Sequence, residues 1–265
     1  MQSFTGKVAV VTGGASGIGR ALALDFARRG MSLVLADVDA DALQGAAREV
    51  QAAGAACLAV PTDVADAQAV QRLADAAFAR FGKVHVLCNN AGVVIEGTAQ
   101  QATHAEWEWV LGVNLWGVIH GLHAFLPRML AHGEPGHVLN AASMAGMVPF
   151  PQATVYNTAK YGVVGLTETL ARELRQTSLG VSLLLPFWVS TGIFRGGQRR
   201  PPGVERAHGE IDMSAIRDDQ WRTPGQVSAL VLEAIAAGRF YIFTHPETRE
   251  YMEARIRRIQ AAYLP

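Results

Sequence analysis

Short apolar runs alternate with longer amphipathic stretches along most of the chain. The runs at 8–11 and 33–36, for example, are too short for helices and are closely followed by glycine or aspartate. The stretches between such runs place apolar residues on one face of a helix. This alternation is typical of βαβ units, in which helices bury both faces of a parallel sheet. Strands are predicted at 8–11, 33–36, 57–60, 84–88, 137–140, 181–185 and 240–243, and helices at 17–29, 40–53, 66–81, 107–131 and 154–178.

The pattern predicts an α/β fold, a doubly wound, Rossmann-like parallel sheet in three α/β/α layers. No internal repeat or linker divides the sequence, so residues 1–265 are expected to form one domain. Residues 1–140 would form mainly the dinucleotide-binding half, and 141–265 the catalytic and substrate half. The stretch 190–222 lacks periodicity, and so long an irregular segment inside a compact domain indicates a substrate loop or an insert.

Composition narrows the class of protein. Hydrophobic residues make up 50% of the 265 residues and charged residues 17%, which supports a large core and argues against disorder. Basic and acidic residues balance at 23 each, so no net charge attracts nucleic acid or an anionic membrane. Two cysteines, Cys57 and Cys88, provide no disulfide framework. With no signal-peptide core and no long apolar run, the sequence predicts a cytoplasmic protein without nucleic-acid or membrane partners.

The first predicted strand leads into a glycine-rich turn, Thr12 to Gly19, at which a helix begins. Glycines at such a turn let the backbone approach a pyrophosphate, whose charge the helix N-terminus stabilises. The spacing T-G-x-x-x-G-x-G differs from the common G-x-G-x-x-G, and glycine-rich turns also serve tight packing. The position of the turn between the first strand and the first helix favours dinucleotide binding.

Asp37 ends the second predicted strand, 18 residues after Gly19. A carboxylate at this position can accept hydrogen bonds from both hydroxyls of an adenosine ribose, and it would repel a 2′-phosphate. The simpler alternative is a solvated turn residue, since Asp39 and Asp41 lie nearby. Because Val38 offers no basic partner for a phosphate, the sequence favours NAD over NADP.

Tyr156 and Lys160 are the strongest candidates for catalysis. Residues four apart in a helix share a face, so the lysine ammonium can lie beside the phenol. A nearby cation stabilises phenolate and lowers the tyrosine pKa, which makes a better base at working pH. A Y-x-x-x-K pair is common by chance, but here it follows Ser143 by 13 residues. Ser143 lies just past a predicted strand end, where parallel sheets bind their ligands.

These motifs together resemble the short-chain dehydrogenase/reductase family over nearly the whole chain. The matching residues, in the order that the family has them, are Thr12-Gly13-x-x-x-Gly17-x-Gly19, Asp63-Val64, Asn89-Asn90-Ala91-Gly92, Asn114, Ser143, Tyr156 with Lys160, and Pro186 to Thr191. The resemblance implies that Tyr156 is the acid/base and that Ser143 polarises the substrate oxygen. It further implies that Lys160 holds the nicotinamide ribose and lowers the tyrosine pKa, while Asn114 supports a water relay.

The resemblance also implies contacts with the cofactor. Asp63 and Val64 would border the adenine, Asn90 would hold the adenosine side, and Val189 would meet the carboxamide through its backbone. The predicted cofactor-binding residues are Gly13, Ser16, Gly17, Ile18, Gly19, Asp37, Asp63, Val64, Asn90, Ala91, Gly92, Tyr156, Lys160, Pro186, Val189 and Thr191. Two positions depart from the family pattern: Ala142 stands where a serine is frequent, and Phe187 stands where glycine is usual. A phenylalanine lacks the conformational freedom of glycine, so the nicotinamide end is expected to have a different shape.

Apolar residues flank the catalytic positions in the sequence, and pockets for small molecules are mostly apolar with few polar groups. They suggest a hydrophobic alcohol or ketone that could be aromatic. A weaker resemblance to bacterial dehydrogenases that oxidise the Cα alcohol of lignin-type aryl ethers points the same way; it is carried by Gly112-Val113-Asn114 to Pro135-Gly136-His137 and by Tyr241 to Pro246. The predicted substrate-pocket residues are Val94, Met144, Phe150, Trp188 and Phe194.

The predicted function is NAD-dependent interconversion of such a secondary alcohol and its ketone. Two alternatives are an NADPH-dependent carbonyl or 3-oxoacyl-carrier reductase and a non-catalytic NAD-binding sensor; an extended-type sugar-nucleotide epimerase fits the glycine spacing less well. The resemblance implies a homodimer or homotetramer joined through helices 107–131 and 154–178. His120 and His123 share a predicted helix face, but no carboxylate or cysteine cluster accompanies them, so no metal site is predicted.

Overall fold

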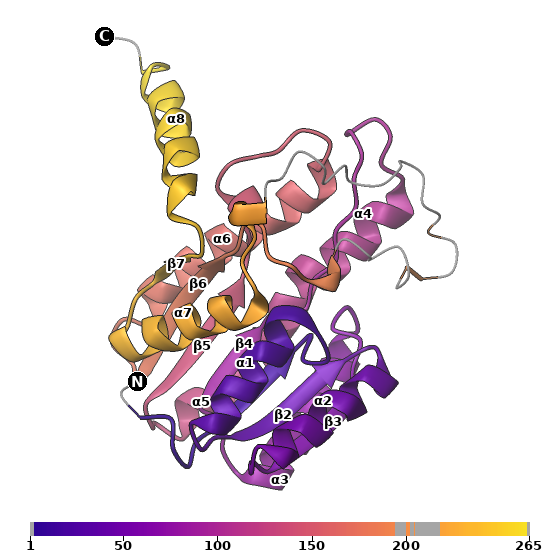
Figure 1. Cartoon of the computed structure of the whole chain (residues 1–265), viewed down its shortest axis with the longest axis vertical. Coiled ribbons are helices and arrows are strands. Elements are labelled where there is room, and N and C mark those ends of the chain that lie inside the picture. Colours follow the sequence, from indigo (N-terminus) through magenta and orange to yellow (C-terminus); the bar gives the residue numbers. More distant parts are fainter. Residues whose placement is uncertain (1–2, 194–199, 202–203, 205–217, 264–265) are drawn as a thin grey trace.

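The computed structural model describes residues 3–193, 200–201, 204 and 218–263. In this part of the chain, seven strands form one sheet in the order β3-β2-β1-β4-β5-β6-β7 (Figure 1). All neighbouring strands are parallel. The strands are β1 Val8–Thr12, β2 Ser32–Asp37, β3 Cys57–Pro61, β4 Val86–Asn89, β5 Gly136–Ala141, β6 Leu179–Leu185 and β7 Tyr241–Phe243. The strand order reverses between β1 and β4, which confirms the predicted doubly wound fold and places the ligand-binding crevice at this switch point.

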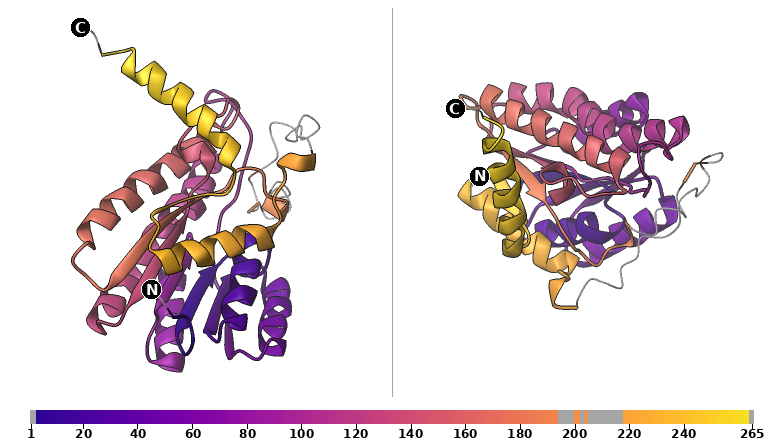
Figure 2. Two further views of the ribbon diagram at one scale, coloured as in Figure 1. Left: turned by 60° about the vertical axis from the view of Figure 1, so that its left-hand side comes forward. Right: turned by 90° about the horizontal axis from the view of Figure 1, so that it is seen from above.

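Helices cover both faces of the sheet, as the view from above in Figure 2 shows. One layer contains α1, α2 and α7, with α1 packed against α7; the other contains α3, α5 and α6, with α3 packed against α5 and α4 against α6. The helices are α1 Gly17–Arg28, α2 Ala40–Ala52, α3 Ala67–Phe81, α4 His104–Leu111, α5 Gly117–Ala131, α6 Thr154–Glu173, α7 Pro224–Ala237 and α8 Arg249–Gln260. The three-layer arrangement follows from strands that are apolar on both sides.

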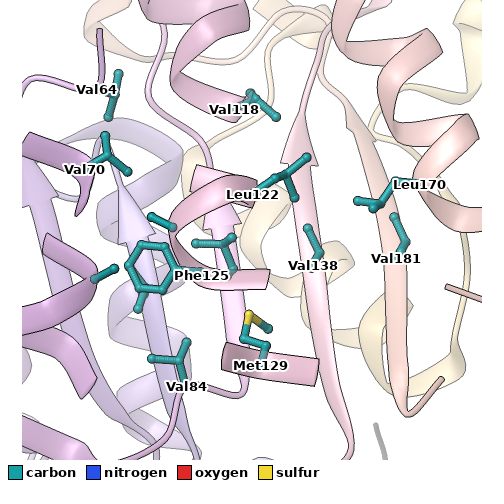
Figure 3. Packing of buried hydrophobic residues seen from close by; sticks show 14 of the residues in the cluster. Val64, Val70, Val84, Val118, Leu122, Phe125, Met129, Val138, Leu170 and Val181 are labelled. Atoms are coloured by element: carbon teal, nitrogen blue, oxygen red, sulfur yellow. The ribbon is translucent and has the colours of Figure 1, made fainter. Parts of the chain in front are cut away.

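Successive residues of each strand point to opposite layers of helices. In β1, Val8 and Val10 join the core under α3, α5 and α6, whereas Ala9 and Val11 join the core under α1, α2 and α7. Figure 3 shows the first of these cores, where Phe125 of α5 lies among valines from the neighbouring elements. Continuous apolar strands therefore hold both helix layers on one sheet.

The structure differs from the predicted boundaries at two helices. The helix predicted at 154–178 ends at Glu173, because the hydroxyl of Thr177 donates to Leu174 O and accepts from the Leu179 amide, which turns the chain into β6. The helix predicted at 107–131 is interrupted by a π-helical turn, Gly112–Trp116, between α4 and α5. Such turns often mark functional sites.

Helices α7 and α8 were not predicted from the sequence. α7 begins with a capping box, in which Thr223 and Gln226 exchange hydrogen bonds, and it packs against α1. α8 leaves the body of the protein and carries the C-terminus away from it (Figures 1 and 2). None of its residues is buried, and its large apolar residues Ile256 and Ile259 are exposed. A helix this polar lacks the apolar stripe that signals burial in a sequence.

The segment His104–Ala131, which contains α4 and α5, is long and apolar enough by composition to cross a membrane. In the fold, however, the buried face of α5 packs against α3 and β4. Phe125 and Met129, on this face, are fully buried in the core. The apolar composition of α5 is thus used for packing against the sheet.

A prediction about stability follows from His137 in β5, whose side chain is almost completely buried. Nε2 of its ring lies 2.8 Å from the Ser182 hydroxyl, and Nδ1 has no hydrogen-bond partner. Burial lowers the pKa of His137 from 6.5 to about 3. The unfolded chain therefore binds a proton below pH 6.5 that the folded protein does not bind, and the free energy of unfolding falls by about 1.4 kcal/mol per pH unit between these limits.

The measurement is the urea-unfolding free energy of wild type and His137→Gln from pH 7.5 to 4.5. The variant should lose stability at pH 7.5 but show a shallower decline toward low pH. Equal slopes for the two proteins would contradict the assignment of this pH dependence to His137.

Candidate active site

A cavity of about 550 Å³ lies at the carboxyl ends of the central strands. It is lined by residues that follow β1, β2, β4, β5 and β6, together with the start of α6. Most of the residues predicted from the sequence are brought together here. Those that line the cavity are Gly13, Ser16, Gly17, Ile18, Asp37, Asp63, Val64, Asn90, Ala91, Gly92, Val94, Ser143, Phe150, Tyr156, Lys160, Pro186, Trp188, Val189 and Thr191.

The glycine turn between β1 and α1 is packed too closely for side chains. A Cβ atom on Gly19 would lie 2.1 Å from Gly13 O, and one on Gly13 would lie 2.9 Å from the Cα atom of Ala91. Gly13 also has a φ of +65°, which L side chains rarely adopt. Gly19 does not line the cavity; it allows α1 to start close behind the turn.

Thr12 and Asn90 tie this turn to the segment after β4. The Thr12 hydroxyl accepts hydrogen bonds from the backbone amides of Asn90 and Ala91, at 2.9 and 3.1 Å, and donates to Cys88 O. The Asn90 carboxamide donates to Thr12 O at 2.9 Å. Thr12 was noted in the sequence only as part of the glycine motif, and its role becomes visible because β1 and β4 are neighbours. The two strand ends are thus held together around the cavity.

Asp37 lies at the far end of the cavity, and its carboxylate is fixed by the backbone. Oδ2 accepts a hydrogen bond from the Ala15 amide in the glycine turn, and Oδ1 accepts one from the Asp39 amide, both at 3.1 Å. The residue is buried, whereas its neighbour Val38 is largely exposed. Asp37 is therefore not a solvated turn residue, and its orientation is set before any ligand binds.

Ser143, Tyr156 and Lys160 form the opposite end of the cavity. Lys160 is buried, donates to Ala141 O at 3.0 Å, and has its Nζ atom 5.6 Å from the centre of the Tyr156 ring. The Ser143 hydroxyl lies 3.4 Å from Pro186 O, and the amide of Ala145 donates to it. β5, β6 and α6 thus place a hydroxyl, a phenol and an ammonium group together.

The pKa values in this cluster reflect burial more than charge. Desolvation raises the pKa of Tyr156 above its ordinary value, and the hydrogen bond with Ser143 opposes this shift. Burial lowers the pKa of Lys160 to about 8, so the ammonium is still charged at neutral pH. The structure therefore differs from the sequence prediction that Lys160 lowers the tyrosine pKa: the opposing effect comes from Ser143, and the net direction is upward.

Asn114 lies in the π-helical turn and is completely buried. Its carboxamide makes a pair of hydrogen bonds with the backbone of Val93, accepting from the amide and donating to the carbonyl, both at 2.8 Å. A Cβ atom on Gly92 would lie 3.1 Å from Asn114 Oδ1 and 3.5 Å from Lys160 Nζ. Asn114 does not line the cavity itself; its side chain holds the 92–93 segment beside the lysine.

The predicted substrate residues are only partly placed around the cavity. Val94, Phe150 and Trp188 line it, but Met144 points into the core and is 1% exposed, so its prediction as a pocket residue was wrong. Met144 begins a short buried 3₁₀ turn, Met144–Gly146, which packs against α6. Phe194 lies outside the described residues, as does most of the predicted loop 190–222.

Sequence reasoning missed several residues of the cavity wall. Phe187 was noted only as a departure from glycine, yet its ring lines the cavity and stacks on Phe150, with centroids 5.7 Å apart. It also contacts the rings of Trp188 and Tyr251, the latter at the start of α8. The remaining wall residues that the sequence did not single out for the pocket include Ile95, Trp109, Val113, Gln152 and Pro201. Only the folded chain brings together segments that lie so far apart in sequence.

In the described part of the chain, no three His, Cys, Asp or Glu side chains are grouped so that they could hold a metal ion. His120 lies 3.0 Å from Val64 O through Nδ1 and packs beside Trp116, while His123 is exposed. The two histidines therefore have ordinary structural roles on α5.

Comparisons with known proteins agree with this arrangement. The family described as short chain dehydrogenase matches residues 7–200. The chain is 38% identical over 245 residues to the 1-deoxy-11-beta-hydroxypentalenate dehydrogenase of Streptomyces exfoliatus, covering 92% of this chain and 84% of the relative. It is 32% identical over 272 residues to the C alpha-dehydrogenase of Sphingobium sp. strain SYK-6, covering 100% and 89%.

A solved structure is similar over the whole length. The short-chain dehydrogenase/reductase from Burkholderia phymatum in complex with NAD superposes with a TM-score of 0.94 at 43% identity, covering 100% of this chain and 98% of that one. Three features together define a nicotinamide-dependent oxidoreductase. They are a parallel sheet whose strand order reverses between β1 and β4, a glycine-rich turn after β1, and the cluster of Ser143, Tyr156 and Lys160. The chain belongs to the short-chain dehydrogenase family, and it is an enzyme that acts on CH–OH groups or the corresponding carbonyls.

The glycine turn generates a prediction. Gly19→Ala would place a methyl group against Gly13 O and should displace the turn, so the dissociation constant for NADH should rise at least about tenfold. Nucleotide fluorescence titration measures this constant. Gly45→Ala in α2 is the matched control, because a Cβ atom there meets nothing within 4 Å. Unchanged NADH binding by Gly19→Ala would refute the tight-packing argument.

Proposed function

We propose that this enzyme interconverts a hydrophobic secondary alcohol and its ketone with NAD as the preferred cofactor. The observation that carries the proposal is the single cavity with Asp37 at one end and Ser143, Tyr156 and Lys160 at the other. A dinucleotide is long enough to reach both ends, with its pyrophosphate at the glycine turn. The alcohol would occupy the apolar space beside Tyr156.

The residues present fit such a cofactor. Gly13 and Gly17 line the cavity at the N-terminus of α1, a position that favours an anion. The fixed carboxylate of Asp37 would accept hydrogen bonds from ribose hydroxyls and repel a 2′-phosphate, which supports NAD over NADP. Asp63, Val64, Val189 and Thr191 all line the cavity. Asp63 and Val64 would border the adenine, and Val189 and Thr191 would lie along the nicotinamide.

The protein's own contribution to the reaction is proton transfer and orientation. A nicotinamide cofactor, when bound, would supply the hydride chemistry. Tyr156 takes the hydroxyl proton during oxidation and returns it during reduction. Ser143 orients the substrate oxygen, and its hydrogen bond opposes the upward shift of the Tyr156 pKa. The Lys160 ammonium would hold the nicotinamide ribose. Asn114 fixes the backbone at 92–93 and would support the relay of the proton toward solvent.

The wall of the cavity supports a hydrophobic substrate. Phe150, Phe187 and Trp188 form a continuous aromatic surface, with Phe187 in contact with both of the others. Aromatic rings prefer offset or tilted partners of their own kind, so the surface suits an aryl substituent. One named relative is a dehydrogenase of an 11-beta-hydroxy compound and the other is a C alpha-dehydrogenase, and both names are consistent with this proposal.

An NADPH-dependent carbonyl or acyl-carrier reductase is less well supported, because Asp37 occupies the place a 2′-phosphate would need. An acidic carrier protein would need basic residues on the surface, and Arg128 on α5 is instead paired with Asp75 and lies over the Phe78 ring. A non-catalytic sensor would have no need for the four groups at Asn114, Ser143, Tyr156 and Lys160. We further propose a cytoplasmic homodimer or homotetramer joined through α4–α5 and α6, a surface on which Trp116 is exposed.

Tyr156→Phe tests the catalytic assignment. The change removes only the hydroxyl, so it should lower kcat at least about 1000-fold and leave NADH binding unchanged. The assay follows absorbance of reduced nicotinamide with aliphatic, alicyclic and benzylic secondary alcohols. Tyr161→Phe is the matched control, since the Tyr161 hydroxyl donates to Met147 O away from the cluster. Substantial turnover by Tyr156→Phe would refute the role of Tyr156.

Asp37→Ala tests the cofactor preference. Removal of the carboxylate should weaken NAD binding and relieve the repulsion of a 2′-phosphate. The ratio of kcat/KM for NADP to that for NAD should therefore rise at least about tenfold. Asp41→Ala, an exposed acid at the start of α2, is the control and should leave the ratio unchanged. An unchanged ratio in Asp37→Ala would contradict the proposed ribose contact.

A further inference from the structure

Thr244 and His245 follow the last strand, β7, and both are buried although neither lines the cavity. The parallel register pairs Leu185 at the end of β6 with Phe243 at the end of β7, so the residues after these two strands lie next to each other. Phe187 is one of these residues, and it lines the cavity. Two buried polar side chains therefore lie beside a residue of the cavity wall.

A chain of hydrogen bonds runs through these two side chains. The backbone amide of Phe187 donates to the Thr244 hydroxyl at 3.2 Å, and the hydroxyl oxygen lies 2.6 Å from Nδ1 of His245. Burial lowers the pKa of His245 below its ordinary value, so the ring is neutral at neutral pH and carries one proton. This proton is on Nε2, which lies 3.0 Å from Gln220 O, because a carbonyl oxygen can only accept. Nδ1 therefore accepts the proton of the Thr244 hydroxyl, and the hydroxyl oxygen is free to accept from Phe187.

The peptide bond between Pro186 and Phe187 is held at both ends. Its carbonyl oxygen, Pro186 O, accepts the Met144 amide hydrogen at 2.9 Å. The same oxygen lies 3.4 Å from the Ser143 hydroxyl. The amide at the other end of this bond is the group that donates to Thr244. Because a peptide group is planar, bonds at both ends fix its orientation, and they set the direction in which the Phe187 side chain leaves the backbone.

His245 also contacts the Phe187 side chain directly. The two rings meet edge to face, with an interplanar angle of 85° and centroids 5.7 Å apart, while Phe150 stacks on Phe187 at the same separation. Edge-to-face and offset stacked arrangements are the ones that aromatic rings prefer. His245 therefore acts on Phe187 in two ways, through Thr244 on the backbone and through its own ring on the side chain.

We propose that Thr244 and His245 are positioning residues that fix the peptide group and ring of Phe187 and thereby give the cavity a preference for a flat aromatic substituent. This inference deepens the proposed function, because it takes the cavity to receive the alcohol or ketone. A fixed wall of Phe187 stacked on Phe150 favours a flat ring over a puckered ring of similar size, because only the flat ring keeps its whole face in contact. Without the Thr244 hydroxyl, the Phe187 ring takes several orientations and this preference declines.

Thr244→Val tests this role, because valine has the shape of threonine but cannot accept the Phe187 amide hydrogen. The measured quantity is the ratio of kcat/KM for acetophenone to that for cyclohexyl methyl ketone, with NADH in excess. Relative to wild type, Thr244→Val should lower this ratio at least about threefold. Thr244→Ser retains the hydroxyl and should retain the wild-type ratio. A role in stability alone would reduce the amount of folded enzyme for both ketones equally, so it would leave the ratio unchanged.

A double variant tests whether Thr244 acts through Phe187. Phe187→Leu removes the ring and should lower the ratio by itself, and the addition of Thr244→Val should then cause no further decline. His245→Phe retains a ring but loses both nitrogens, so it should lower the ratio as Thr244→Val does. Thr5→Val is the matched control, because the Thr5 hydroxyl donates to Arg29 O away from the cavity. An unchanged ratio in Thr244→Val or His245→Phe, or an equal further decline in the Phe187→Leu background, would overturn the proposal.

Binding without turnover separates this inference from the proposed function. Each ketone is titrated into the NAD complex of each protein, in which it cannot be reduced, and calorimetry gives the dissociation constants. If wild type turns over no ketone or alcohol, the proposed function fails, and these constants decide the role of Thr244. Tighter binding of acetophenone than of cyclohexyl methyl ketone by wild type, lost in Thr244→Val and retained in Thr244→Ser, supports that role. Equal constants for the two ketones in wild type, or binding of neither ketone, overturn it.

Discussion

The hydrogen bonds of Thr12 across the ends of β1 and β4 are the interaction on which the cavity depends. One hydroxyl accepts the amides of Asn90 and Ala91, and this brings the glycine turn so close to the following segment that only glycine fits at positions 13 and 19. The same closeness lets Ala15 in the turn bond to Asp37 at the end of β2. Three strand ends are thereby fixed relative to one another, and this end of the cavity is held largely by backbone groups.

The catalytic end is assembled by a similar use of backbone groups. Lys160 donates to Ala141 O at the end of β5, and the Ser143 hydroxyl lies against Pro186 O just after β6. Both side chains are therefore held by strand ends rather than by each other. Because the groups are oriented by the sheet, the cluster has its geometry before substrate arrives, which is the condition for efficient positioning.

The fold and the grouping of Ser143, Tyr156 and Lys160 at the cavity could be predicted from the sequence because they depend on local patterns. The apolar strands and the glycine turn each signal themselves within a few residues, and Tyr156 and Lys160 share a helix face by spacing alone. The pocket wall could not be predicted in this way. Met144 was assigned to it because it follows Ser143, yet backbone direction turns it into the core. Trp109 and Pro201 both line the cavity although they lie in distant parts of the sequence.

The contact between Phe187 and Tyr251 has a consequence for how such enzymes diverge. None of the residues of α8 is buried, so substitutions along most of this helix should change the free energy of unfolding little. Its first turn nevertheless touches an aromatic ring that lines the cavity. Insertions, truncations or exchanges in this helix can therefore change the shape of the cavity while Ser143, Tyr156 and Lys160 stay unchanged. Related enzymes can therefore differ in substrate range through changes in α8, while the core of the fold stays the same.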